Sequence, residues 1–158
     1  MDRRSFIEKA TLGGATVVAA NVLGASKAKA HQTEKHHHHD IEYTKAEKEI
    51  LETTADCIET GKACRAHCIS ELREGHVDLK DCLSADENML AVVTAVNEIV
   101  RNKTAGAAHV KALVQVCRDL CVACAEACKP HAKMHKSCKA CLKACEECVK
   151  ACDKYLKA

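Results

Sequence analysis

From about residue 44 to the C-terminus, small apolar residues recur at every third or fourth position, and charged residues fill many of the positions between them. This spacing places the apolar positions on one face of an α-helix. The clearest example is CKACLKACEECVKAC, residues 138–152, in which the recurring residue is cysteine. At about 100° per residue, its cysteines fall within roughly 80° of one another around a helix. The pattern predicts a rigid helix with a row of sulfur atoms along one side.

The pattern predicts helical segments over residues 44–74, 78–103, 105–129 and from 130 or 133 to 156. Thr44 and Glu47 form a capping-box pattern at the first start, and Gly75 provides a stop. Ser84, with a glutamate three residues later, indicates a second cap inside the second segment. Pro130 suits the first position of the fourth helix, because the N–H that proline lacks would have no partner there.

Short connections between these segments predict that neighbouring helices pack antiparallel. The expected fold is therefore all-α, an up-down-up-down four-helix bundle with a cysteine-lined core. Cysteine occupies the inward positions where an ordinary bundle places leucine. The cysteines are Cys57, Cys64, Cys68, Cys82, Cys117, Cys121, Cys124, Cys128, Cys138, Cys141, Cys145, Cys148 and Cys152.

This topology predicts two unlike ends. We call the end that holds the connections near Gly75 and Pro130 the mouth. Metal-binding side chains should gather there, namely Cys64, Cys68, Cys82, Cys124, Cys128, Cys138, Cys141, His67, His76, His131, Met134 and His135. We call the opposite end the aliphatic end, and its expected lining is Ile50, Val93, Val96, Val100, Val110 and Val114. Only the fourth helix, through Cys148 and Cys152, is expected to carry sulfur toward it.

The N-terminus has the pattern of a twin-arginine export signal. Arg3 and Arg4 precede Ser5 and Phe6, and Ala28-Lys29-Ala30 has the small-x-small form that signal peptidases cut. We therefore expect residues 1–30 to be a cleaved signal peptide, residues 31–42 a His-rich linker and residues 43–158 the bundle domain. The expected location is periplasmic or otherwise extracytoplasmic, without membrane insertion after cleavage.

The charge of the chain argues against nucleic acid or an anionic membrane as a partner. The net charge is +2, and residues 1–30 hold five Lys and Arg against two Asp and Glu, so the remainder is near −1. The run His36 to His39 is either a flexible linker or a weak metal-catching arm.

The chain has 13 cysteines, and their number and spacing restrict the roles that these residues can have. One or two buried cysteines act as small hydrophobes, but 13 at helical spacing do not fit that role. Disulfides would do little for cysteines on one continuous helix, although bridges between helices are not excluded. Iron–sulfur clusters use loop cysteines at other spacings. Several tetrathiolate zinc sites would bury much uncompensated negative charge.

Cu(I) satisfies these constraints best. It is a soft ion that accepts low coordination by thiolate and thioether. Side chains three or four residues apart on a helix start about 5–6 Å apart, so same-helix cysteine pairs form natural two-sulfur clamps. One Cu(I) per thiolate is electrically neutral, and each sulfur can bridge two ions. We expect about one Cu(I) per cysteine, bound with release of protons, and His131, Met134 and His135 as further ligands at the mouth.

These features resemble the exported branch of the bacterial copper storage proteins. The resemblance covers the twin-arginine motif and residues 42–158, and CRDLCVACAEAC followed by CKACLKACEECVKAC carries most of it. It implies a four-helix bundle whose interior thiolates hold many Cu(I) ions, mostly by same-helix cysteine pairs. It also implies a mouth with His and Met ligands, and a homotetramer in exported members.

The leading hypothesis is thus a non-catalytic copper reservoir, and copper-donor and copper-acceptor proteins would be its partners. An iron–sulfur electron carrier and a metallothionein-like protein that detoxifies zinc or other soft metals remain the alternatives. An enzyme is not indicated, because no catalytic triad, phosphate-binding loop or paired-carboxylate motif is present in the sequence.

Overall fold

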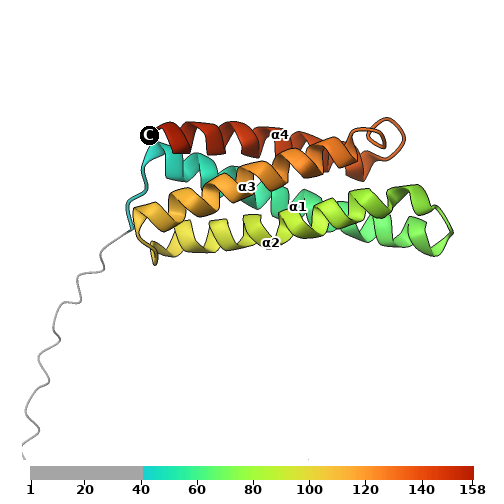
Figure 1. Ribbon diagram of the computed structural model, residues 1–158, viewed down its shortest axis with the longest axis horizontal. Helices are drawn as coiled ribbons and strands as arrows, with labels where there is room; N and C mark the ends of the chain where they lie inside the picture. The colour runs from blue at the N-terminus through green and yellow to red at the C-terminus, as the bar shows by residue number, and fades with distance from the viewer. Residues whose placement is uncertain (1–40) are drawn as a thin grey trace, which may run out of the picture. The chain divides into compact units, whose positions relative to one another are not determined.

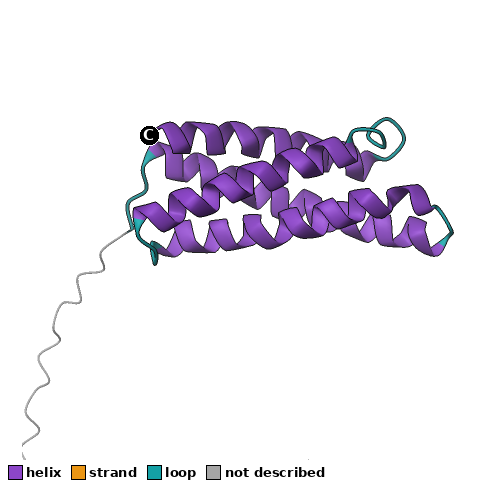
Figure 2. Ribbon diagram, viewed as in Figure 1, coloured by secondary structure: helices purple, strands orange, loops and turns teal. Residues whose placement is uncertain are grey.

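The computed structural model describes residues 41–158, and within them all regular structure is helical (Figures 1 and 2). The helices are α1 (Lys45–Arg73), the 3-10 helix η1 (Val77–Leu79), α2 (Lys80–Asn102), α3 (Ala107–Cys128) and α4 (Lys136–Lys157). The expected signal peptide, the run His36 to His39 and all but the last two linker residues lie outside the described residues.

The four long helices form an antiparallel bundle (Figure 1). Helix α1 packs against α2 and α4, and α3 packs against the same two helices. The backbones of the diagonal pairs lie farther apart, and these helices meet through side chains at the axis, such as Cys141 and Asp86. Consecutive helices are therefore neighbours around a ring, as short connections require. The predicted all-α, up-down-up-down four-helix bundle is confirmed. Its central axis is lined by one stripe from each helix.

Both predicted ends of α1 are present. The Glu47 N–H donates to Thr44 Oγ1 at 3.2 Å, and the Thr44 N–H donates to Glu47 Oε2 at 2.7 Å, which completes a capping box. Gly75 has a φ of +96°, a left-handed conformation that glycine adopts without strain. The His76 N–H then donates to the Glu71 carbonyl at 3.0 Å, which closes the helix in a Schellman motif.

Two predicted helix starts are wrong. Ser84 lies exposed inside α2 and caps nothing, because the 3-10 turn of η1 leads directly into α2 at Lys80. Pro130 does not open α4, which begins six residues later after His135. The intervening chain forms tight turns in which the His131 carbonyl accepts the N–H groups of Met134 and His135 at 3.0 and 2.9 Å. These turns hold both histidines close to the mouth.

The aliphatic end is buried as predicted. Its lining residues are all at most 8% exposed, namely Ile50, Val93, Val96, Val100, Val110 and Val114. A polar pair that the sequence analysis missed lies among them. Asn97 Nδ2 donates to Thr54 Oγ1 at 2.8 Å and to the Leu51 carbonyl at 3.0 Å, and Arg101 donates to Asn97 Oδ1. Because buried amides need partners, this network fixes the register of α1 against α2.

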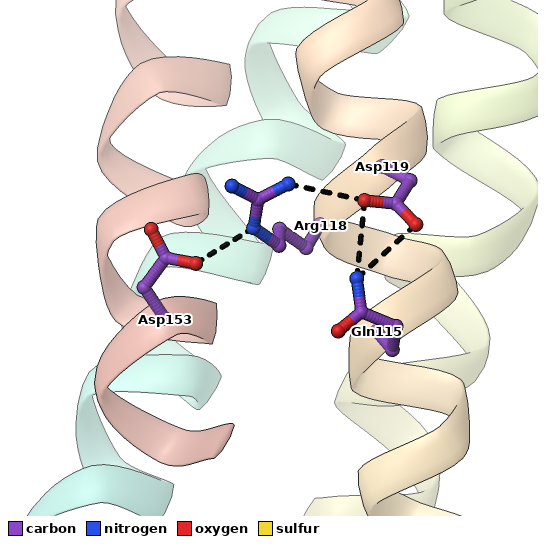
Figure 3. A network of polar contacts seen from close by, with 4 residues as sticks. All are labelled: Gln115, Arg118, Asp119 and Asp153. Atoms are coloured by element: carbon purple, nitrogen blue, oxygen red, sulfur yellow. Dashed lines mark hydrogen bonds and ion pairs between the residues drawn. The ribbon is translucent and has the colours of Figure 1, made fainter. Parts of the chain in front are cut away.

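A second polar network joins α3 to α4 on the outer surface (Figure 3). Arg118 Nε donates to Asp153 Oδ1 at 2.6 Å, and its Nη1 contacts Asp119, which in turn accepts from Gln115. Arg118 and Asp153 each directly follow a core cysteine, Cys117 and Cys152 respectively. The ion pair thus ties the two helices together beside the sulfur atoms nearest the aliphatic end.

The capping arrangement leads to a stability prediction. Thr44→Ala removes the cap of α1 and should lower the free energy of unfolding by about 1 kcal/mol. Ser84→Ala is the matched control, and it should leave stability unchanged or slightly raised because alanine has the higher helix propensity. Urea unfolding followed by far-UV circular dichroism measures both. An equal loss in the two variants would contradict the observed start of α2.

Candidate metal centre

The stripes of all four helices bring every cysteine of the chain to the bundle axis. Each of these side chains has no exposed surface, and all are free thiols. Cys82 Sγ and Cys128 Sγ are 3.5 Å apart, whereas a disulfide requires about 2.05 Å. The disulfide scaffold that the sequence left open is therefore not the arrangement in this structure.

The sulfur atoms form groups in which all members lie within 4.8 Å of one another. From the mouth inward, these groups include Cys64 with Cys68, Cys82 and Cys138; Cys64 with Cys128 and Cys141; Cys124 with Cys141 and Cys145; Cys57 with Cys121 and Cys148; and Cys117 with Cys148 and Cys152. Cys64, Cys141 and Cys148 each belong to two groups. These shared members join the groups into two sets, one of eight cysteines toward the mouth and one of five toward the aliphatic end. Cys121 and Cys57 of the second set lower the pKa of Cys145 in the first, so the two sets adjoin and the thirteen thiols form one column.

Same-helix pairs occur within this column, as the sequence suggested. Cys64 and Cys68 share a group on α1, and Cys148 and Cys152 share one on α4. Each such pair, however, is completed by at least one sulfur from another helix. The groups named above are thus three- or four-sulfur sites that span helices. Spacing along one helix could predict the pairs, but not which third sulfur faces them.

The column extends deeper than expected. Sequence analysis assigned sulfur near the aliphatic end to α4 alone, through Cys148 and Cys152. This is wrong, because Cys117 of α3 lies within 4.8 Å of both. Cys57 of α1 and Cys121 of α3 also join Cys148. Three helices therefore supply sulfur to the inner half of the column, whereas α2, whose one cysteine is Cys82 near the mouth, supplies none there.

Asp86 is a core carboxylate that the sequence analysis missed. It has no exposed surface, and its Oδ1 accepts a hydrogen bond from the Cys141 thiol, with 3.4 Å between the two atoms. Its Oδ2 has no hydrogen-bond partner within residues 41–158. Gly61 of α1 makes room for it, since a Cβ there would lie 3.1 Å from Asp86 Oδ1. Its position four residues after Cys82, on the inward stripe of α2, could have identified it.

The mouth brings three histidines together. His67 Nε2 and His135 Nδ1 are 2.8 Å apart, and the ring centroids of His131 and His135 are 6.3 Å apart. His131 also lies 3.8 Å from Asp78. His135 is the residue directly before α4 and so lies above Cys138. His67, which directly precedes Cys68 on α1, was expected at this end but not among the ligands.

Met134 and His76 lie apart from this histidine group. The Met134 side chain belongs to a residue that is 73% exposed, and it lines a hollow on the outer side of the α3–α4 connection. His76 is exposed and lies 4.0 Å from Glu71. Of the three predicted mouth ligands, His131 and His135 are therefore close together, whereas Met134 faces solvent.

Burial opposes ionisation of these thiols. It raises the pKa of the Cys68 thiol to about 11. Thiols along the column also change the pKa values of their neighbours. Hydrogen bonds from Cys124, Cys141, Cys64 and Cys82 lower the pKa of Cys128, and the resulting thiolate raises the pKa of Cys82. Ionising one thiol therefore makes its neighbours harder to ionise. A cation that replaces the protons would remove this penalty, so the column suits soft metal ions.

Comparison with known proteins identifies the family. The chain belongs to the copper storage protein family, whose sequence profile matches residues 42–157. It is similar to the solved structure of a cytosolic copper storage protein from Streptomyces lividans with five coppers, at 31% identity and a TM-score of 0.66. That match covers 72% of this chain and 93% of the other.

A second structure, Ccsp from Streptomyces lividans loaded with 10 copper equivalents, is 32% identical with a TM-score of 0.65. It covers 71% of this chain and 84% of the other. No curated protein sequence gives a significant match.

These comparisons correct the expected location. The twin-arginine pattern predicted an exported, periplasmic protein, but the similar solved structure is that of a cytosolic copper storage protein. The expectation of export is therefore wrong. The arginine motif itself lies outside the described residues. None of the described helices is long and apolar enough to span a membrane.

Asp86 gives the metal-free protein a predicted pH dependence. Burial raises the pKa of this carboxyl from 3.8 to about 7. Between these values the folded chain binds more protons than the unfolded chain, so stability falls as pH rises from about 4 to about 7. Asp86→Asn removes this loss. The variant should be more stable than the parent at pH 8, by on the order of 2–4 kcal/mol, and nearly equal to it at pH 4.

Urea unfolding of the reduced, metal-free protein at the two pH values measures this difference. Asp56→Asn is the control, because Asp56 is exposed on the outer face of α1 and its neutralisation should change stability little at either pH. A gain at Asp86 that is equal at pH 4 and pH 8 would show that ionisation is not its cause.

Proposed function

We propose that this protein stores copper as Cu(I), held by the column of buried cysteine thiolates and without catalytic activity. The observation that carries the proposal is the continuity of the column, in which Cys64, Cys141 and Cys148 each belong to two sulfur groups and Cys145 adjoins Cys121 and Cys57 of the inner groups. A protein that carried one ion or one discrete cluster would need one group. Membership of the copper storage family supports the same role.

The charge balance favours Cu(I) over a divalent ion. Each Cu(I) that replaces a thiol proton leaves the core neutral. A zinc ion on four thiolates would leave a net charge of −2, which is costly where no water reaches the sulfur atoms. The groups of three sulfurs also suit an ion that accepts low coordination. The proposed ligands are therefore all thirteen cysteines.

His131 and His135 are the proposed ligands at the mouth, together with His67, which lies 2.8 Å from His135. Their rings offer nitrogen ligands directly above Cys138 and Cys68. An arriving ion could thus pass from nitrogen to sulfur without crossing apolar side chains. Met134, being mostly exposed, is proposed to contact copper only before it reaches this group.

The oligomeric state follows from the family resemblance as a further proposal. We propose a homotetramer, on the basis of the resemblance to the copper storage family and because Val122 and Val149 line an exposed hollow between α3 and α4. Light scattering on the reduced protein at micromolar concentration should give four times the mass of one chain. The mass of a single chain under these conditions would contradict the tetramer and leave the copper-binding proposal intact.

An anaerobic Cu(I) titration tests the function. Reduced protein competing with a chromophoric chelator should take up about one ion per cysteine, which is about 13 per chain, and release about one proton for each ion. The loaded protein should be colourless, unlike an iron–sulfur protein, and excess zinc should not displace the copper. Saturation after one to three ions would overturn the proposal.

Cysteine variants test whether the thiolates are shared. Because Cys64 and Cys141 each belong to two sulfur groups, replacing both with serine should lower the capacity by more than two ions. Ser70→Ala, which changes an exposed hydroxyl on the same helix as Cys64, should keep the full capacity. A loss of two ions or fewer in the double variant would indicate that each ion depends on its own cysteine rather than on a bridged chain.

A further inference from the structure

A run of lysines borders the mouth on one side. Residues 129–143, which form the α3–α4 connection and the first turns of α4, contain five lysines and no aspartate or glutamate. Lys129 is paired with Glu126 at 3.5 Å. Lys133, Lys136 and Lys139 are exposed, and none of them forms an ion pair within residues 41–158. We call these three residues the lysine edge.

The position of the lysine edge is electrostatically unfavourable for α4. The N-terminus of a helix carries partial positive charge, and proteins usually place acidic or capping side chains there. Helix α1 follows this rule through Thr44 and Glu47. Helix α4 has no acidic residue in its first turn and no side-chain cap, and it carries Lys136 and Lys139 there instead. Stability alone does not account for this concentration of positive charge.

The lysine edge lines a hollow to which Met134 also contributes a thioether, a soft metal ligand. A depression of about 560 Å³ is lined by Ala132, Lys133, Met134, Lys136, Lys139 and Leu142. This volume is in the range of small-molecule sites. Met134 offers a thioether in it and is 73% exposed. The hollow therefore combines three cations, a ligand that Cu(I) accepts and the apolar side chain of Leu142.

The opposite side of the mouth differs in charge. On the α1–α2 side, Glu71 lies 3.8 Å from His67, and Asp78 lies 3.8 Å from His131. These carboxylates face the histidines, whereas the lysine edge lies on the outer side of the α3–α4 connection. Residues 71–81 on that side hold four Asp and Glu against Arg73 and Lys80. The net positive charge therefore lies on the α3–α4 approach, which leads past Met134 toward His131 and His135.

This charge determines which form of copper is attracted. A free Cu(I) cation would be repelled by three unpaired lysines, whereas two thiolates around one Cu(I) give an anion. The geometry points to the lysine edge as a docking site for a small anionic Cu(I) complex, in which thiols bearing carboxylates hold the ion. The lysines would bind the carboxylates and bring the ion to Met134 and the histidine group. This inference rests on the proposed storage function, since it specifies how the ion arrives.

The transfer is a ligand exchange without oxidation or reduction. Two cysteine thiols of the column replace the two thiolates of the complex on Cu(I). Two Cu–S bonds break and two form, and the protons that leave the cysteines are taken up by the departing thiolates. The products are two neutral donor thiol groups and a Cu(I) ion on two protein thiolates with a net charge of −1. This charge falls toward zero as later ions share the same sulfurs, and copper remains Cu(I) throughout.

The rate of loading from two donors of opposite charge tests the docking site. The full reduced chain is mixed anaerobically with Cu(I) bound by mercaptosuccinate, which bears carboxylates, or by cysteamine, which bears an ammonium group. The variant K133Q/K136Q/K139Q should load about tenfold more slowly from the mercaptosuccinate complex at low salt. It should load at least as fast as the parent from the cysteamine complex.

The control variant K45Q/K48Q/K111Q loses the same charge at the aliphatic end, where all three lysines are exposed. It should stay within about twofold of the parent with both donors. The difference between the two variants should shrink at high salt, where screening acts within a few ångströms. Equal rates for the two variants with mercaptosuccinate, or equal slowing with both donors, would overturn the inference.

The final copper content separates this inference from the proposed function. All three proteins should reach the same capacity, because no cysteine is changed. Full loading without charge preference would overturn the docking site alone. Failure of the parent to take more than a few ions from either donor would overturn the storage function, and the docking site with it.

Discussion

The burial of thirteen thiols along one axis is the constraint on which the rest of this structure depends. A thiol is apolar enough to replace leucine in a bundle core, so the metal-free chain can fold around it. A thiolate does not fit such a core, because its charge is not solvated there. The core therefore has two stable compositions, one with protons on sulfur and one with monovalent soft cations on sulfur. Cys128 raises the pKa of the neighbouring Cys82 thiol, so ionising several adjacent thiols without a bound cation would be unfavourable.

The four-helix arrangement makes this exchange compatible with one fold. The backbone of each described helix lies close only to those of its neighbours around the ring, so diagonal helices meet through side chains and the axis is lined by side chains and not by backbone. Replacing protons with ions there need not disturb the helix hydrogen bonds. The features that hold the bundle together lie elsewhere: the cap and Schellman motif of α1, the buried Asn97 network and the Arg118–Asp153 ion pair. Function and stability thus use different residues of the same helices.

Much of this could be predicted from the sequence, because helical periodicity is a local property. The spacing of Cys138 to Cys152 gave the helix and its inward face, and short connections gave the ring order. The predictions that were wrong concern features that depend on contacts between segments. Pro130 was compatible with a helix start, but the turns around His131 took precedence. The depth of Cys117 and the third sulfur of each group depend on the stagger between helices, which no single helix encodes.

Asp86 was missed because hydrophobic patterning treats a carboxylate as facing solvent. The predicted cellular location was wrong because a short arginine motif is weaker evidence than similarity over the whole bundle.

If ions enter at the mouth as proposed, a column lined with histidine at one end and closed by Ile50, Val96 and Val114 at the other would fill and empty from one end. Ions that entered last would lie nearest the mouth and leave first, and those beside Cys117 and Cys152 would leave only after the positions above them were emptied. The store would then have two pools, a quickly exchanged one near Cys68 and Cys138 and a long-lived reserve below it. A cell could draw on the quickly exchanged pool first, whereas the long-lived pool would retain ions taken up during an earlier excess.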